Sequence, residues 1–260
     1  MNSKILIIDI ETAPNIVYAW GLYDQNISID QIVQDGYMLC YTAKWLGSKD
    51  YIYDSIFNYG GFKYKPTDDY KIAVSAWKLM NEADIIIAHN GDHFDLKWFN
   101  TLFIKHGLKP VSTYKSIDTL KAAKNHFKFL SNRLDYIART LGVGEKLKHE
   151  GISLWIKCMK GDKDAWKKME MYNKRDVQIL ENVYKKLRPF IKNHPNLSLY
   201  GNLTDITCTA CNSKNVERRG YSFTSSGKFA RFVCKECGKW SRSRKNVLTD
   251  EQKDNLRNGL

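Results

Sequence analysis

Residues 5–8 form an unbroken hydrophobic run, and acids then alternate with isoleucine at Asp9, Ile10 and Glu11. A short apolar, β-branched run of this kind predicts a central strand buried on both faces. Side chains two residues apart on a strand point to the same side, so Asp9 and Glu11 are expected to project together. Two buried like charges are unfavourable unless a cation offsets them, whereas at a surface they simply end the strand. The pair alone leaves both interpretations open.

Strand-like and helix-like patterns follow along the first part of the chain. Strands are predicted at 38–45, 51–56, 84–88 and 112–117. Helices are predicted at 70–80, 93–106, 119–129, 132–141 and 164–188, with Asp118 placed to cap the third of them. Residues 14–36, in which Tyr18, Trp20 and Tyr23 stand among polar residues, predict a long loop with at most one short helix. Strands that cluster early and then alternate with helices predict a mixed α/β sheet, antiparallel in its first part and followed by βα units.

The segment 192–202 is rich in turn-forming residues and marks the predicted domain boundary. The predicted organisation is a main domain over 1–192, a small domain over 203–246 and a polar, frayed or weakly helical tail over 247–260.

The charge of the chain indicates its class of partner. A formal net charge of +13 over 260 residues points to a polyanion, most simply nucleic acid. No apolar run approaches the roughly 20 residues that span a bilayer, and the first residues do not form a signal peptide. We therefore expect a cytoplasmic protein without a membrane partner, in a compartment where thiols stay reduced. Nothing in the sequence predicts an oligomer.

Four of the six cysteines form two Cys-x-x-Cys pairs, Cys208 with Cys211 and Cys234 with Cys237, separated by 22 residues. Four thiolates at this spacing predict one tetrahedral structural zinc ion, which a segment of this size needs in order to fold. Disulfides are the alternative, which a reducing compartment disfavours. The isolated Cys40 and Cys158 are expected in the core.

Basic and aromatic residues are interleaved in the same region. From Gly201 onward the chain has 12 Lys and Arg against 6 Asp and Glu. Such a mixture suits single-stranded nucleic acid, since cations can contact phosphates and rings can stack on bases. The rings can equally form the small core of the domain. Arg242, Arg244 and Lys245, just past the second cysteine pair, are predicted to contact phosphates.

Two further acids lie at positions where the predicted sheet would bring them close to Asp9 and Glu11. Asp95 closes the run Asn-Gly-Asp-His-Phe-Asp after the strand at 84–88. Tyr172 and Asp176 are four residues apart, hence on one face of the longest predicted helix, beside an apolar stripe. Each acid alone has a simpler interpretation. Asp95 suits the start of a helix, where the dipole favours acids, and Asp176 suits a solvated helix edge.

Taken together, Asp-x-Glu, Asn-x-x-x-Phe-Asp and Tyr-x-x-x-Asp, in this order, resemble the three exonuclease motifs of the DEDD superfamily. The tyrosine is similar to that of the DEDDy branch, which includes the proofreading domains of family-B DNA polymerases. The flanking Ser-Ile-Asp-Thr-Leu at 116–120 and Asn-Arg-Leu at 132–134 also look like predicted RNase H-like exonucleases of phage and bacterial genomes. The resemblance covers about residues 4–190, and the cysteine region looks like the zinc ribbons that accompany transposases.

The resemblance implies a ribonuclease H-like mixed sheet flanked by helices and a metal-dependent 3′–5′ exonuclease acting on single-stranded ends, with DNA favoured. It implies two Mg²⁺ or Mn²⁺ ions and release of nucleoside monophosphates. Asp9 would bridge both ions, Glu11 and Asp176 would complete the first site, and Asp95 would hold the second, partly through water. Tyr172 would orient the attacking water. Two further residues of the second motif, Asn90 and Phe94, would contact the terminal nucleotide or support the turn.

Other functions stay open at this stage. One is an RNA-trimming exoribonuclease, and another is a non-catalytic nucleic-acid or partner-binding protein with a vestigial exonuclease fold. The ribbon can also serve to dock a polymerase or a repair or replication complex. A bacterial or phage-infected cell is the expected setting.

Overall fold

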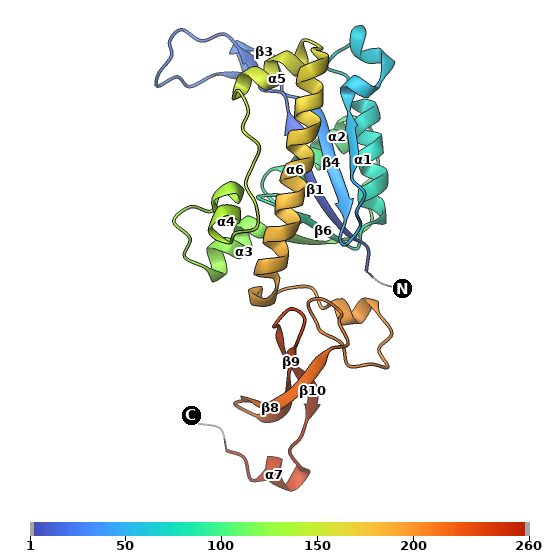
Figure 1. Ribbon diagram of the computed structural model, residues 1–260, viewed down its shortest axis with the longest axis vertical. Coiled ribbons are helices and arrows are strands. Elements are labelled where there is room, and N and C mark those ends of the chain that lie inside the picture. The colour runs from blue at the N-terminus through green and yellow to red at the C-terminus, as the bar shows by residue number, and fades with distance from the viewer. Residues whose placement is uncertain (1–2, 258–260) are drawn as a thin grey trace. The chain divides into compact units, whose positions relative to one another are not determined.

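The computed structural model describes residues 3–257 and divides the chain into two compact units (Figure 1). We call Lys4–Tyr184 the sheet unit and the part from Lys185 onward the cysteine unit, and each is described by itself. The domain boundaries predicted from the sequence stay a prediction.

The sheet unit is built on one five-stranded mixed sheet. Its strands are β1 (Ile5–Thr12), β4 (Met38–Trp45), β5 (Ile52–Ser55), β6 (Ile85–Ala88) and β7 (Lys115–Asp118), in the order β5-β4-β1-β6-β7. β4 pairs antiparallel with β1 and with β5, whereas β6 pairs parallel with β1 and with β7. The predicted mixed sheet, antiparallel first and parallel afterwards, is confirmed.

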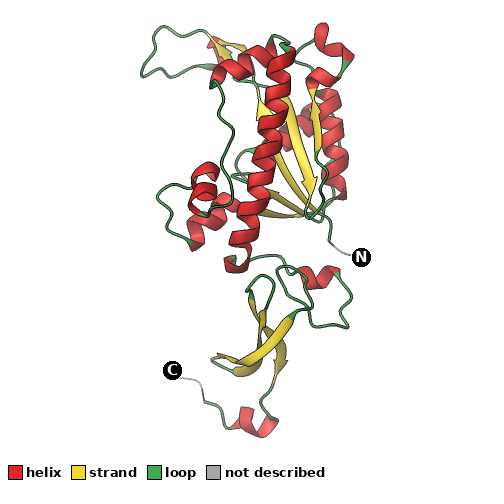
Figure 2. Cartoon of the chain, in the orientation of Figure 1, coloured by secondary structure: helices red, strands yellow, loops and turns green. Residues whose placement is uncertain are grey.

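Helices cover the sheet on both faces (Figure 2). They are α1 (Tyr70–Glu82), α2 (Asp95–Lys105), α3 (Thr119–His126), α4 (Leu134–Thr140), α5 (Ile152–Met159) and α6 (Lys163–Leu187). Leu6, Ile8 and Ile10 of β1 share a core with residues of α1 and α2. Residues alternate along a strand, so Asp9 and Glu11 point to the opposite face, where α6 lies.

The predicted cap at Asp118 is confirmed, because its carboxylate accepts hydrogen bonds from the backbone N–H groups of Leu120 and Lys121. The sequence did not predict α5. No side chain caps its first turn, because the helix follows Gly151, whose φ of +64° requires a glycine-like backbone.

Residues 14–36 contain more order than the predicted loop. β2 (Ile16–Val17) pairs antiparallel with β3 (Ile32–Gln34), and the 3₁₀ helix η1 (Ile29–Gln31) precedes β3. Strands of two or three residues leave no alternating pattern in the sequence, so only their pairing reveals them. Two further 3₁₀ turns, η2 (Ile56–Asn58) and η3 (Gly60–Lys63), lead from β5 toward α1.

The cysteine unit contains a second, three-stranded antiparallel sheet. Its strands are β8 (Val216–Thr224), β9 (Gly227–Cys234) and β10 (Trp240–Asn246), in the order β10-β9-β8. Two 3₁₀ turns, η4 (Arg188–Phe190) and η5 (Leu197–Tyr200), precede the sheet, and the short helix α7 (Asp250–Asp254) follows it. β8 and β9 form a hairpin that leads into the second cysteine pair. Within residues 3–257, no helix has the length and apolar character that crossing a membrane requires.

Candidate functional site

Three of the four predicted acids meet at the end of β1. Asp9 and Glu11 project from β1, and Asp176 projects from α6, 165 residues further along the chain than Glu11. One carboxylate oxygen of each lies within 4.8 Å of the others. Asp9 is held in place by α6 itself, since the amide nitrogen of Asn173 donates to its Oδ2 at 2.6 Å.

Asp95, the fourth acid, lies beside this group rather than within it. It is the first residue of α2 and is buried, and its Oδ1 accepts a hydrogen bond from the backbone N–H of Ile10 at 3.2 Å. Its charge still reaches the group, because it helps to raise the pKa of Asp9. Burial raises the pKa of Asp95 to about 7.

Burial makes the acidic group costly to charge without a cation. It raises the pKa of Glu11 to about 8, and burial together with the neighbouring carboxylates raises the pKa of Asp9 well above its ordinary value. Within the described part of the chain, Oδ1 of Asp176 is buried and has no hydrogen-bond partner. A divalent cation would satisfy that oxygen and replace the bound protons. A donor set made only of oxygen suits Mg²⁺ or Mn²⁺.

A lysine that the sequence analysis did not single out already lies beside the acids. The Nζ atom of Lys146 forms an ion pair with Asp176 and donates to the hydroxyl of Tyr172 at 3.2 Å. Lys146 comes from the loop between α4 and α5, which is pinned by Arg175 donating to the carbonyl of Glu145 at 3.0 Å. The charged segment Glu-Lys-Leu-Lys-His-Glu between Gly144 and Gly151 was the available signal, but loops carry no period that would place it beside the acids.

Aromatic residues close the other side of the acidic group. The ring of Tyr172 contacts the rings of His149, at 4.8 Å between centroids, and Trp155, at 6.0 Å. The indole N–H of Trp155 donates to Oε2 of Glu11 at 3.2 Å. Burial raises the pKa of Tyr172, so its hydroxyl keeps its proton and can hold a water in place. Sequence reasoning missed His149, Trp155 and Asn173, because only tertiary contacts connect them to the acids.

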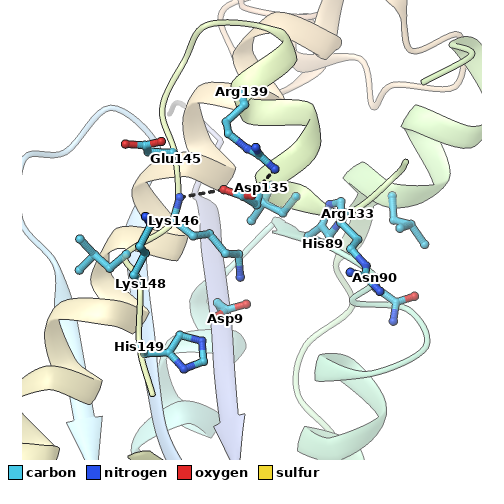
Figure 3. A pocket seen from close by; sticks show the side chains of 13 residues that line it. Asp9, His89, Asn90, Arg133, Asp135, Arg139, Glu145, Lys146, Lys148 and His149 are labelled. Atoms are coloured by element: carbon cyan, nitrogen blue, oxygen red, sulfur yellow. Dashed lines mark hydrogen bonds and ion pairs between the residues drawn. The ribbon is translucent and has the colours of Figure 1, made fainter. Parts of the chain in front are cut away.

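A cavity of about 910 Å³ opens over this group (Figure 3). The loop that carries Lys146 and His149 forms one wall, and the start of α4 forms another. Its lining residues are Asp9, His89, Asn90, Leu120, Arg133, Leu134, Asp135, Arg139, Glu145, Lys146, Leu147, Lys148 and His149. Four of these are Lys or Arg, and Asp135 and Glu145 also line the walls, so the walls carry more cations than acids.

The remaining residues of the second motif occupy different places. Asn90 lines the cavity, and its φ of +66° is stabilised by a hydrogen bond from its backbone N–H to Asp118 at 2.9 Å. Phe94 is not among the residues that line the cavity, and its ring packs against that of Trp98. Gly91 is required by the tight turn, because a Cβ there would lie 2.3 Å from the Cβ of Ala88.

The four sulfurs of Cys208, Cys211, Cys234 and Cys237 lie within 4.8 Å of one another. This arrangement is consistent with a small zinc-binding module. The contact between the side chains of Cys208 and Cys211 lowers the pKa of Cys208 and raises that of Cys211, and burial raises the pKa of Cys237. A metal bound by all four sulfurs would displace the protons that these thiols keep. Of the predicted phosphate contacts, Arg242 covers the ring of Phe229 at 4.1 Å, and Arg244 and Lys245 are exposed on β10.

Comparisons with known proteins agree with this fold. A family model described as RNase_H superfamily matches residues 6–188. The DNA polymerase III PolC-type of Ureaplasma parvum is 28% identical over 149 residues, which are 53% of this chain and 10% of that protein. The solved structure of the family B DNA polymerase from the hyperthermophilic archaeon Pyrobaculum calidifontis is similar in fold, with a TM-score of 0.54 at 14% identity over 72% of this chain. The similar region spans 25% of that polymerase chain, so this chain corresponds to only a part of either relative.

Proposed function

The chain belongs to the RNase H superfamily, and from this premise we propose that it is a 3′–5′ exonuclease of the tyrosine (DEDDy) branch. It removes nucleoside monophosphates from the 3′ end of single-stranded nucleic acid, with DNA preferred to RNA. The observation that carries this proposal is the meeting of Asp9, Glu11 and Asp176 oxygens within 4.8 Å. Its similarity to parts of two DNA polymerases is a further support.

The reaction needs two divalent ions, Mg²⁺ or Mn²⁺, which when bound stabilise the charge on the attacking and leaving oxygens. Asp9, Glu11 and Asp176 would hold the first ion, with Asp9 shared, and Asp95 would hold the second partly through water. The position of Asp95 beside the group, rather than within it, suits a ligand that acts through water. The oxygen-only donor set fits these metals.

The chain's own residues position the reactants. Tyr172 keeps its proton and orients the attacking water by a hydrogen bond. Trp155 and Asn173 fix the carboxylates of Glu11 and Asp9 through the hydrogen bonds they donate. The basic walls of the cavity attract the phosphates of the strand, and Asn90 contacts the terminal nucleotide. Phe94, away from the cavity lining, supports the turn instead.

The cysteine unit binds one structural zinc ion, and its Arg242, Arg244 and Lys245 bind the phosphates of nucleic acid. Support comes from the four neighbouring sulfurs and from guanidinium groups stacked on rings, such as Arg231 over Trp240 at 4.7 Å. Docking to a polymerase or a repair complex is the alternative role of this unit.

The proposal is tested by incubating the full-length protein with Mg²⁺ or Mn²⁺ and 5′-labelled single-stranded DNA or RNA. We expect a ladder that shortens from the 3′ end, faster on DNA, and no cleavage by the matched Asp9→Ala protein. A strand with a blocked 3′ end should resist. Cleavage of a closed circle would point to an endonuclease, and binding without any cleavage would point to a non-catalytic protein.

A further inference from the structure

A strongly exposed aromatic segment begins close to the acidic group. We call residues 15–36 the aromatic arm; it contains the β2–β3 pair and the loop between those strands. Trp20 is 97% exposed, Tyr23 83% and Tyr18 73%, and Leu22 and Ile29 are also open to solvent. In Figure 1 the loop beside β3 extends away from the helices. Isolated apolar side chains on a surface are ordinary, but a concentration of rings on one segment marks an interaction surface.

Hydrogen bonds close the arm where its two sides meet and form one turn in the loop between them. The backbone N–H of Tyr18 donates to the carbonyl of Gln31 at 2.9 Å, and the side chain of Gln31 returns a bond to the carbonyl of Tyr18 at 2.9 Å. The side chain of Gln25 donates to the carbonyl of Tyr23 at 2.9 Å. Two glutamine side chains thus bond backbone carbonyls within the arm, and the rings of Tyr18, Trp20 and Tyr23 stay exposed.

The base of the arm closely follows β1, the strand that carries Asp9 and Glu11. The arm starts four residues after Glu11, and its two ends are tied by the N–H of Gly36 donating to Oδ1 of Asn15 at 2.6 Å. A hollow of about 310 Å³ lies at this base, lined by Thr12, Pro14, His149, Gly151, Ile152 and Trp155. Because His149 also lines the large cavity, the two hollows adjoin at His149, and a strand that leaves the cavity past His149 is directed toward Thr12 and Pro14, the residues that lead into the arm.

The charge of the arm shows which part of a strand it fits. Residues 15–36 contain Asp24, Asp30 and Asp35 and no Lys or Arg, in a chain with 41 Lys and Arg. Such a segment repels phosphates and cannot follow a nucleic-acid backbone. Uncharged rings instead match the flat faces of bases, which stack on aromatic side chains without regard to sequence.

We infer that the arm is a base-stacking platform for the unpaired nucleotides that precede the 3′ end held in the site. This inference rests on the proposed function for the position of the 3′ end. The acids of the arm keep the phosphates turned away toward the basic cavity walls, while Trp20 and Tyr23 receive the bases. The arm therefore favours strands with unpaired bases next to the end and disfavours a duplex, whose bases are already stacked.

The test measures binding by fluorescence anisotropy on the full-length Asp9→Ala background, which prevents cleavage. The probes are a short thymidine strand and a strand of equal length in which abasic units replace all but the 3′-terminal nucleotide. Trp20→Ala and Tyr23→Ala should each weaken binding of the thymidine strand about 5- to 100-fold and leave binding of the abasic strand unchanged. The salt dependence should stay the same, because no cation is removed.

The matched control is Tyr64→Ala, since Tyr64 is 85% exposed and lies outside the arm in the same unit. It should leave both affinities unchanged, and all three variants should keep the parent's thermal unfolding because the rings are exposed. Equal losses on both strands, or none, would overturn the inference. So would a Trp20→Ala change that only dissociates a dimer in sedimentation, because the arm would then bind a second copy.

The wild-type cleavage assay separates this inference from the proposed function. If the wild-type protein cleaves normally but the arm variants bind thymidine strands as tightly as the parent, the base-stacking role of the arm is refuted and the proposed nuclease function stands. No cleavage by the wild-type protein, combined with a base-dependent loss at Trp20, would refute the nuclease and leave the platform as part of a binding protein.

Discussion

Replacing Glu11 by glutamine should stabilise the metal-free protein at alkaline pH. Glu11 is partly buried beside Asp9 and Asp176, and its pKa rises from 4.5 to about 8. The folded state therefore keeps a proton that the unfolded chain releases between these two pH values. The stability that this proton supports is fully present below pH 4.5 and is lost as pH rises through about 8.

The size of the effect follows from the same shift. Each pKa unit is worth about 1.4 kcal/mol, so the change from 4.5 to about 8 bounds the cost of charging Glu11 at about 5 kcal/mol. Glutamine still places a polar amide at this partly buried position, so we expect Glu11→Gln to recover about half of this bound. For a unit of this size, that is a rise of about 5–10 °C in Tm.

The assay is thermal unfolding followed by circular dichroism at 222 nm, which reports the helices, from pH 5 to pH 8.5 in EDTA. The wild-type Tm should fall across this range and recover when Mg²⁺ is added, because the cation replaces the protons. Glu11→Gln should give a higher and flatter profile. The control, Asp50→Asn, changes an exposed carboxyl in the turn before β5 and should follow the wild type. A flat wild-type profile in EDTA, or a destabilised Glu11→Gln protein, would refute the reasoning.

Three further outcomes are expected. Asp9→Ala or Asp176→Asn should lower the cleavage rate at least ~10³-fold while the protein stays folded. Tyr172→Phe should still bind the metal, as measured by calorimetry, but should cleave more slowly. Digestion at the wild-type rate by pure Asp9→Ala protein would refute the nuclease assignment. Elemental analysis should find about one zinc ion per chain, and Cys208→Ser or Cys234→Ser should abolish zinc binding. A chain that folds fully without zinc would contradict this prediction. A protein ending at Leu203 should still cut, but bind nucleic acid more weakly and with a shallower salt dependence; an unchanged salt slope would favour docking of a protein partner.

Much of the fold was predictable because local patterns encode it. The apolar run of β1 required burial. The 3.6-residue period placed α1, α2 and α6, and start or stop residues placed α3 and α4, within a few residues of their observed bounds. The cap at Asp118 could be read directly, since the bond it makes reaches only two and three residues ahead. The pairing of the cysteines in space likewise followed from their spacing, because a metal site of this class has little freedom.

The sequence alone determined the acids, their order and the strand and helix that carry them. Only the tertiary structure decided what surrounds them. Trp155 meets Glu11 across 144 residues, and Lys146 meets Asp176 across 30, from a loop without periodicity. Contacts of this kind depend on how helices pack over the sheet, and packing between distant segments leaves no repeating signal in the chain. The same holds for the aromatic arm, whose two very short strands and glutamine hydrogen bonds follow no sequence period.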